Sequence, residues 1–407
     1  MRKLSITDLD LHGKRVFVRV DFNVPLANGR IADDTRIQAS LPTIHHALNQ
    51  GATVVLASHL GRPKGRPNPQ MSLRPVADRL ADLLNRPVAF ATDCVGDEAR
   101  RTVDEVATGL ARHSAAGAEA AGVVLLENLR FHPEEEHNDA AFSAALAALA
   151  DEYVDDAFGA AHRAHASVEG ITHHVRRAAA GLLMERELRY LGQALESPER
   201  PFVAILGGAK VSDKIEVIRN LLGKVDHLLV GGAMAYTFFK ARGTAVGRSL
   251  VEDDKLEAAR AIETAAAKTC TRLALPTDHT VTDRIADGAA HDVLAVGDAR
   301  IGERVGVDIG PATIDAYVAA ISRAKTIVWN GPMGVFEIEA FATGTNAVAR
   351  AVAAVNGTTI IGGGDSIAAV KKAGVADRIT HISTGGGASL EFLGGRALPG
   401  VVALTEK

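Results

Sequence analysis

Short runs of β-branched and other apolar residues alternate along this chain with longer stretches that have helical spacing. The runs typical of strands are Arg15–Val24, Thr53–Ser58, Val123–Glu127, Tyr153–Ala157, Phe202–Leu206, His227–Val230, Arg272–Leu275, Thr326–Trp329 and Thr358–Ile361. Helical spacing occurs in Thr35–Gln50, Ser72–Asn85, Ala140–Ala150, Asp213–Leu222, Asp253–Lys268, Ile314–Ala324 and Ser366–Ala373. Strands that alternate with helices form βαβ units, so the sequence predicts an α/β fold with parallel sheets that are covered on both faces.

Nine or more such units are too many for one open sheet, and two doubly wound domains fit better. The 407 residues agree with this, because a domain has roughly 150 residues. The division is expected between residues 176 and 200. There Glu185–Leu195 has the pattern of a charged amphipathic helix, and the proline-containing segment 197–201 interrupts the chain before a new strand begins.

The composition argues against several classes of protein. Hydrophobic residues make up 47% and charged residues 23%, as in ordinary globular proteins, and no apolar stretch approaches the roughly 18 residues of a membrane span. The first residues have no signal-peptide pattern, so a soluble, cytoplasmic protein is expected. A net charge of −4 gives no case for binding nucleic acid or membranes. Cys94 and Cys270 are expected to be buried free thiols.

Basic side chains follow the predicted strands of the amino-terminal half, where those strands end. They are Arg19, Arg36, Arg62, Arg130 and Arg163, with His59 and His162 nearby. Because the carboxyl ends of parallel strands meet at one edge of a sheet, these groups are expected to converge there. Converging guanidinium groups favour an anionic ligand, since their planar forks match phosphate and carboxylate. Asp21 and Asn23 would bind a hydroxyl of that ligand. The alternative is a set of unrelated surface arginines.

Glycine-rich segments follow the strands of the carboxyl-terminal half. They are residues 206–214, 230–234, 305–311, 330–337, 361–366 and 383–388. A glycine loop that opens a helix exposes backbone N–H groups beside the positive end of the helix dipole, which suits phosphate. Lys210 and Lys214 are expected on one face of an opening helix, and the set predicts a nucleotide site. Asp365 is the carboxylate placed to bind Mg²⁺, with a helix N-cap as the alternative.

Familiar signatures of other activities are missing. The sequence has no G-x-x-x-x-G-K-[ST], no complete G-x-G-x-x-G after a strand and no G-x-S-x-G, which disfavours P-loop ATPases, standard dehydrogenases and serine hydrolases. The pairs His162/His165 and His173/His174 lack a third ligand with zinc spacing. We therefore expect hydrogen-bonded or solvated histidines there.

The motifs together resemble those of the phosphoglycerate kinase family. The resemblance rests on Arg19–Pro25, Ser58–Pro63, Ala157–Ser167, Ala204–Lys214, Asn330–Glu337, Gly362–Ser366 and Ser383–Leu390, in the order of that family. It implies two α/β domains joined by a helix, with a cleft between two lobes. The phosphoglycerate-binding domain would comprise residues 1–180 and the tail from about 390 to 407, and the nucleotide-binding domain residues 181–389. A monomer is implied as well.

The resemblance also implies a reaction and site residues. The reaction is reversible transfer of the 1-phosphoryl group of 1,3-bisphosphoglycerate to MgADP, which gives 3-phosphoglycerate and ATP. By position, the phosphoglycerate would be held by Asp21, Phe22, Asn23, Arg36, His59, Leu60, Gly61, Arg62, Arg130 and Arg163. The nucleotide would be held by Lys214, Gly306, Glu337, Gly363, Gly364, Asp365 and Ser366, with Asp365 positioning Mg²⁺.

Phosphoryl transfer from an acyl phosphate has a good leaving group, so positioning and charge stabilisation suffice for catalysis. Arg36, Lys210 and the amides near Gly386 are the candidates for that stabilisation. Substrates on different domains would need hinge closure, with segments 181–197 and 383–389 as candidate hinges. Two alternatives stay open: a relative that binds nucleotide without catalysis, and another enzyme class such as an isomerase or dehydrogenase. The chain departs from the family pattern at Ala233, where a third glycine is usual, and at Glu169.

Overall fold

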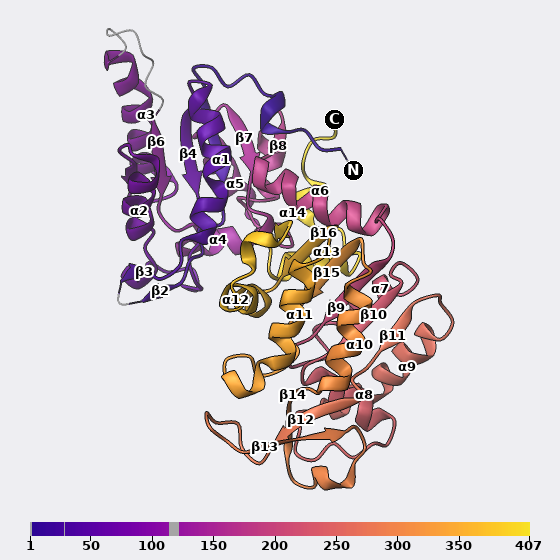
Figure 1. The fold of residues 1–407 in the computed structure, drawn as a ribbon. Helices are drawn as coiled ribbons and strands as arrows, with labels where there is room; N and C mark the ends of the chain where they lie inside the picture. The colour runs from indigo at the N-terminus through magenta and orange to yellow at the C-terminus, as the bar shows by residue number, and fades with distance from the viewer. Residues whose placement is uncertain (1, 28, 114–121) are drawn as a thin grey trace. The chain divides into compact units, whose positions relative to one another are not determined.

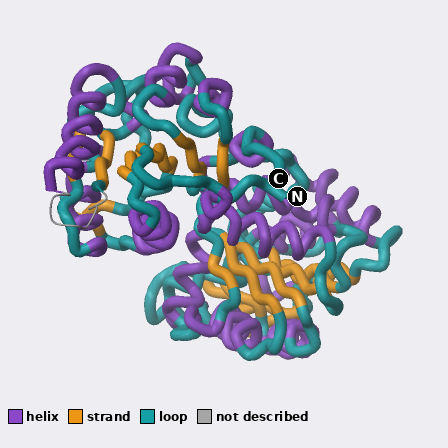
Figure 2. The backbone as a smooth tube through the Cα atoms, turned by 90° about the horizontal axis from the view of Figure 1, so that it is seen from above, coloured by secondary structure: helices purple, strands orange, loops and turns teal. Residues whose placement is uncertain are grey.

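A computed structural model describes residues 2–27, 29–113 and 122–407 of the chain (Figure 1). The chain divides into two compact units. Unit 1 comprises Met1–Arg189 together with Ala397–Lys407, and unit 2 comprises Tyr190–Arg396. In each unit a sheet is enclosed by helices, as Figure 2 shows with strands in orange and helices in purple. No helix in the described ranges is long and apolar enough to cross a membrane.

Unit 1 is built on a six-stranded parallel sheet. The strand order is β5 (Ala89–Ala91), β6 (Val123–Leu126), β4 (Thr53–Ala57), β1 (Arg15–Arg19), β7 (Glu152–Asp155) and β8 (Ala178–Ala180). Strands β4, β6 and β7 are buried throughout, as expected for a sheet covered on both faces. The covering helices are α1 (Thr35–Asn49), α2 (Arg74–Leu84), α3 (Gly96–His113), α4 (Pro133–Glu136) and α5 (Ala140–Ala147).

The two ends of the chain lie together on unit 1, where both termini are marked in Figure 1. The amide of Leu4 donates to the Thr405 carbonyl at 2.8 Å, and the amide of Thr405 donates to the Ala178 carbonyl at 2.9 Å. The short helix α14 (Pro399–Val402) belongs to this tail, and the amide of Gly400 donates to the Ala161 carbonyl. These hydrogen bonds attach the last eleven residues to the amino-terminal unit.

Unit 2 contains a second six-stranded parallel sheet. Its order is β11 (Arg272–Ala274), β10 (His227–Val230), β9 (Phe202–Leu206), β15 (Thr326–Asn330), β16 (Thr358–Gly362) and β17 (His381–Ile382). Its helices are α7 (Ile215–Leu221), α8 (Met234–Ala241), α9 (Leu256–Ala266), α10 (Pro311–Ile321), α11 (Thr343–Ala353), α12 (Gly364–Lys372) and α13 (Gly387–Leu393). Helix α6 (Leu182–Glu196) runs across the boundary between the two units.

The predicted α/β class with two parallel sheets is confirmed, but several elements were not anticipated. Unit 2 also has a three-stranded antiparallel sheet in the order β13 (His291–Ala295), β12 (Asp278–Thr282) and β14 (Val305–Ile309). Strand β13 is mostly exposed, and only its last three residues are apolar. Seven of the eight residues of helix α8 are buried, so it lies inside the unit rather than on its surface.

Two local expectations, on the end of the first strand and on Cys270, differ from the structure. The first strand ends at Arg19 rather than Val24, because the chain leaves the sheet there to form the loop of residues 20–25. Cys94 is a buried free thiol as predicted, whereas Cys270 is exposed. Glu169 stands in a polar setting: it accepts a hydrogen bond from Asn138 Nδ2 at 2.5 Å and pairs with His173 Nε2 at 2.6 Å.

Candidate active site

Residues from three strand ends of unit 1 are joined by hydrogen bonds into one network. After β1, the side chain of Asn23 accepts from the amide of Gly61, which follows β4, at 2.9 Å. The carbonyl of Gly61 in turn accepts from Arg130 Nη1 at 2.8 Å, and Arg130 follows β6. Arg36, in the first turn of α1, pairs with Asp21 Oδ2 at 2.6 Å. The structure therefore brings these sequence-predicted residues together at the carboxyl edge of the sheet.

The remaining predicted residues of unit 1 follow the same strands. The amide of Phe22 donates to Ser58 Oγ at 2.8 Å, which ties the β1 loop to the end of β4. Arg62 is exposed beside Gly61, and Arg163 is half-buried with its Nε 3.1 Å from His162 Nε2. Leu60 is held through both its amide and its carbonyl by Asn128, at 3.2 and 2.8 Å.

Asn128 is a residue that sequence reasoning missed. Its side chain is fully buried, accepts from the amides of Leu60 and Arg130, and donates to the carbonyls of Leu60 and Met71. One amide group thus uses both its acceptor and donor capacity to hold two loops that carry predicted substrate residues. A single asparagine has no periodicity or spacing that would single it out, so only the folded structure shows this role.

Arg19 has a different role from the one expected of it. It is fully buried, and its guanidinium group donates to Ser167 Oγ and to the carbonyl of Val20 and lies 3.2 Å from His59 Nδ1. Its nitrogens are therefore engaged inside the unit. Arg19 positions His59, and the basic edge is formed by the other four arginines, of which Arg130 is also buried.

Burial, together with the positive charge of the neighbouring arginines, perturbs the groups of the basic edge. Desolvation, followed by the nearby charges of Arg19 and Arg130, lowers the pKa of His59 well below its usual value. Burial and the charge of Arg19 lower the pKa of Arg130 to about 10, although Glu136 opposes this. Burial and the charge of Arg130 lower the pKa of His165 to about 3. Neutral histidines among arginines are what a site that awaits an anion would show.

In unit 2, Lys214 and Lys210 differ in their environments. Lys214 is buried and donates to Asn330 Oδ1 at the end of β15, and desolvation lowers its pKa to about 8 although Asp213 and Asp365 oppose the shift. Lys210 is exposed. Helix α7 begins only at Ile215, so the expectation that both lysines lie on one face of a helix is wrong. They belong to the turn before it.

The segment 363–366 forms the start of α12, whose N-cap is Gly363 with φ +90°. A Cβ atom on Gly363 would lie 3.1 Å from Asn330 Nδ2, so a side chain is disfavoured by both space and φ. Ser366 is buried and accepts from the amide of Gly331 at 2.6 Å. Asp365 lies in the first turn and is exposed, so the alternative of a helix N-cap is wrong for this carboxylate.

A cavity of about 260 Å³ lies in unit 2 beside these glycine segments. It is lined by residues that include Gly208, Gly232, Ala233, Tyr236, Phe239, Gly306, Met333, Glu337 and Asp365. Tyr236 Oη lies 2.8 Å from His279 Nδ1, and the two rings stack with centroids 5.6 Å apart. The cavity combines apolar walls with a few polar groups, as small-molecule sites do. Ala233, where the family usually has glycine, is part of the wall.

Gly386 is the N-cap of α13 and has φ +52°. The loop before it is fixed by Ser383 Oγ, which lies 2.6 Å from Ser389 Oγ and accepts from the amide of Gly385. The three residues that we expect to stabilise charge during catalysis are divided between the units. Arg36 belongs to unit 1, and Lys210 and Gly386 belong to unit 2.

Comparisons with known proteins agree with this architecture. The pattern that defines the phosphoglycerate kinase family matches residues 6–396. The chain is 59% identical to the phosphoglycerate kinase of Acidobacterium capsulatum and 58% identical to that of Moorella thermoacetica, in both cases over 100% of each chain. The solved phosphoglycerate kinase of Coxiella burnetii is 42% identical, covers 98% of both chains and superposes with a TM-score of 0.87. The chain belongs to the phosphoglycerate kinase family and is an enzyme of that activity.

Proposed function

We propose that unit 1 holds the phosphoglycerate and unit 2 holds the nucleotide in the transfer of the 1-phosphoryl group between 1,3-bisphosphoglycerate and ADP. The observation that carries this assignment is the hydrogen-bonded basic edge of unit 1, which joins loops after β1, β4 and β6. The complementary feature is the glycine-lined cavity of unit 2. The basic edge suits the anionic phosphoglycerate, and the glycine-lined cavity suits the nucleotide.

In unit 1 the phosphates and carboxylate would be bound by Arg36, Arg62, Arg130 and Arg163, whose guanidinium groups match them bidentately. His59 is neutral and can hydrogen-bond an oxygen of the substrate without adding charge. Asp21 and Asn23 would take the hydroxyl, while Phe22, Leu60 and Gly61 shape the site through their backbone.

In unit 2 the nucleoside would occupy the cavity beside Gly306, with Glu337 near the ribose hydroxyls. The phosphates would approach Lys214 and the amides of 363–366 at the start of α12, where the helix dipole favours negative charge. The exposed carboxylate of Asp365 lines the same cavity, so it fits the single protein carboxylate that Mg²⁺ commonly takes beside phosphate oxygens. Bound Mg²⁺ neutralises phosphate charge.

In the transfer, a carboxylate oxygen of 3-phosphoglycerate attacks the γ-phosphorus of ATP, one P–O bond forms and the bond to ADP breaks. No proton has to move, so catalysis reduces to alignment and charge stabilisation. Arg36, Lys210 and the amide of Gly386 would stabilise the equatorial oxygens. Substrates held by separate units require the units to approach during turnover, and segments 181–197 and 383–389 are the proposed hinges.

We also propose that the protein is a cytoplasmic monomer. Its first domain would comprise residues 1–180 with 390–407, and its second domain residues 181–389.

The assignment is tested by phosphorylation of 3-phosphoglycerate with MgATP, coupled to glyceraldehyde-3-phosphate dehydrogenase and followed as NADH loss. Lys210→Ala is expected to lower kcat at least 100-fold, whereas Lys268→Ala, at an exposed position of unit 2, should retain it. If Lys210→Ala keeps wild-type kcat, Lys210 has no part in charge stabilisation. If the folded wild type binds MgADP without turnover, the chain is a non-catalytic relative.

Replacement of Gly306 by alanine is expected to raise the KM for nucleotide at least tenfold. A Cβ atom there would lie 1.6 Å from Tyr236 Oη and 2.1 Å from Cζ, so the Tyr236 ring must move within the cavity wall. Gly109→Ala is the matched control, because a Cβ atom at this helical glycine meets nothing within 4 Å. An unchanged KM for nucleotide in Gly306→Ala would place the nucleoside elsewhere.

Binding of MgADP is expected to weaken about tenfold between pH 7 and pH 9 because Lys214 loses its proton. The pKa of Lys214 in the free protein is lowered to about 8, so the charged form that attracts phosphate is mostly present below this pH and mostly lost above it. Calorimetric titration at several pH values measures the effect. Lys214→Arg stays charged and should flatten the profile; an equally steep profile in this variant would assign the titration to another group.

A further inference from the structure

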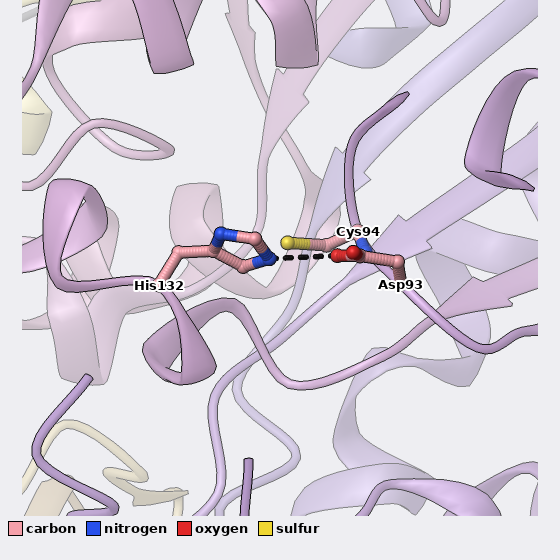
Figure 3. Close-up of side chains that lie close together, drawn as sticks. All are labelled: Asp93, Cys94 and His132. Carbon is pink, nitrogen blue, oxygen red and sulfur yellow. Dashed lines mark hydrogen bonds and ion pairs between the residues drawn. The ribbon is translucent and has the colours of Figure 1, made fainter. Parts of the chain in front are cut away.

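Three side chains of unit 1 that have no place in the proposed mechanism lie close together (Figure 3). Asp93 and Cys94 are in the connection between β5 and α3, and His132 is in the connection between η4 (Leu129–Phe131) and α4. One carboxylate oxygen, the thiol sulfur and one imidazole nitrogen all lie within 4.8 Å of one another. His132 Nε2 is 2.7 Å from Asp93 Oδ1. Figure 3 shows the three side chains pointing toward a common point.

Carboxylate, thiolate and imidazole are the ligand types that Zn²⁺ takes in proteins. Tetrahedral coordination with bonds of about 2.0–2.3 Å would separate the nitrogen and oxygen ligands by about 3.3 Å. The observed 2.7 Å between His132 Nε2 and Asp93 Oδ1 would therefore have to open by about 0.6 Å. For this pair of ligands a small movement would reach the geometry that a bound ion requires, and the sulfur lies within 4.8 Å of both atoms.

The three ligands are held in place by their surroundings. Cys94 is fully buried, and its amide donates to Asp93 Oδ1 at 2.6 Å. The His132 ring packs against Phe142 with centroids 5.3 Å apart. Strand β5, which leads into the Asp93 loop, pairs in parallel with β6, which leads toward His132. Little conformational entropy remains to be lost when an ion binds, which favours binding by these residues.

An ion can reach this cluster through a neighbouring cavity of about 570 Å³. Asp93 and His132 both line the cavity, together with polar residues that include Asn68, Ser72, Thr92 and Glu127. A site with three protein ligands next to such a cavity leaves a fourth position for water or a small ligand. The positions of the three side chains, their ligand types and the neighbouring cavity are all consistent with binding of a metal ion.

We propose that Asp93, Cys94 and His132 form a binding site for Zn²⁺ or another thiophilic divalent cation in unit 1. On binding, the Cys94 sulfur gives its proton to solvent and forms a bond to the ion, and His132 Nε2 contributes its lone pair after any proton on it has left. The hydrogen bond between His132 and Asp93 is exchanged for two bonds to the ion. The ion would connect the β5–α3 and η4–α4 segments.

The test is a titration with Co²⁺, which reports a thiolate ligand by a charge-transfer band in the near ultraviolet. The wild type, reduced and stripped of metal, is expected to bind one Co²⁺ with this band and to lose the band when Zn²⁺ is added. Cys270→Ser removes the only other cysteine, which is exposed, and should behave like the wild type. Cys94→Ser should lose the band, and His132→Gln should bind Co²⁺ at least tenfold more weakly.

The absence of a charge-transfer band in the wild type would overturn the proposal, and so would a band that survives in Cys94→Ser. Circular dichroism and kinase activity without added Co²⁺ or Zn²⁺ establish that each variant is folded. If Cys94→Ser does not fold, His132→Gln, which retains the thiol, decides the question by its affinity. An affinity for Co²⁺ equal to that of the wild type would also overturn the proposal.

Discussion

Replacement of Arg36 by alanine is expected to lower kcat at least 100-fold while the free energy of unfolding changes by no more than about 1 kcal/mol. The side chain is about one-third exposed and pairs with Asp21 Oδ2 at 2.6 Å, so its loss costs little stability. In the proposed mechanism its charge is needed most in the transition state, and its loss also leaves the Asp21 carboxylate unpaired beside an anionic substrate. The coupled assay gives kcat, and urea unfolding gives stability.

Two variants sharpen this prediction. Arg36→Lys keeps the charge but loses the planar fork, so an intermediate kcat is expected. Arg101→Ala removes an exposed arginine on α3 and should leave kcat unchanged. A loss confined to the KM for 3-phosphoglycerate in Arg36→Ala would show that Arg36 binds the substrate without stabilising the transition state.

Replacement of Asn128 by alanine is expected to lower the free energy of unfolding by about 3 kcal/mol or more. The change removes four hydrogen bonds at once and leaves the amides of Leu60 and Arg130 and the carbonyls of Leu60 and Met71 to find other partners. An unsatisfied buried group costs about 1–3 kcal/mol, and part of the sum is recovered when the loops relax. Urea unfolding of the two proteins measures the difference.

The same substitution is expected to raise the KM for 3-phosphoglycerate at least tenfold, because the loops of Leu60 and Arg130 lose their common anchor. Asn128→Asp keeps the acceptor for the two amides but loses the two donated bonds and places a carboxylate at a fully buried position, so it is expected to be destabilised as well. A destabilised Asn128→Ala with an unchanged KM for 3-phosphoglycerate would limit Asn128 to a structural role.

Much of the parallel-sheet architecture could be predicted from local sequence. Strands such as Phe202–Leu206 and His227–Val230 are continuous apolar runs whose bounds the structure confirms, because a strand that is buried on both faces tolerates few polar residues. The segments that follow the strands could be read for chemistry as well, since the carboxyl ends of parallel strands must meet at one edge. Other elements were missed, including the mostly exposed β13 and helix α8, in which Lys240 alone is exposed.

The sequence by itself determined the α/β class, the two parallel sheets and the family, because these follow from periodicity and from motifs that are contiguous in the chain. Only the tertiary structure decided which groups face one another. It buried Arg19 among hydrogen-bond partners, made Asn128 the anchor of two loops and brought Cys94 near His132 across 38 positions. Burial and pairing of this kind depend on contacts between segments far apart in the chain, and local sequence carries no record of such contacts.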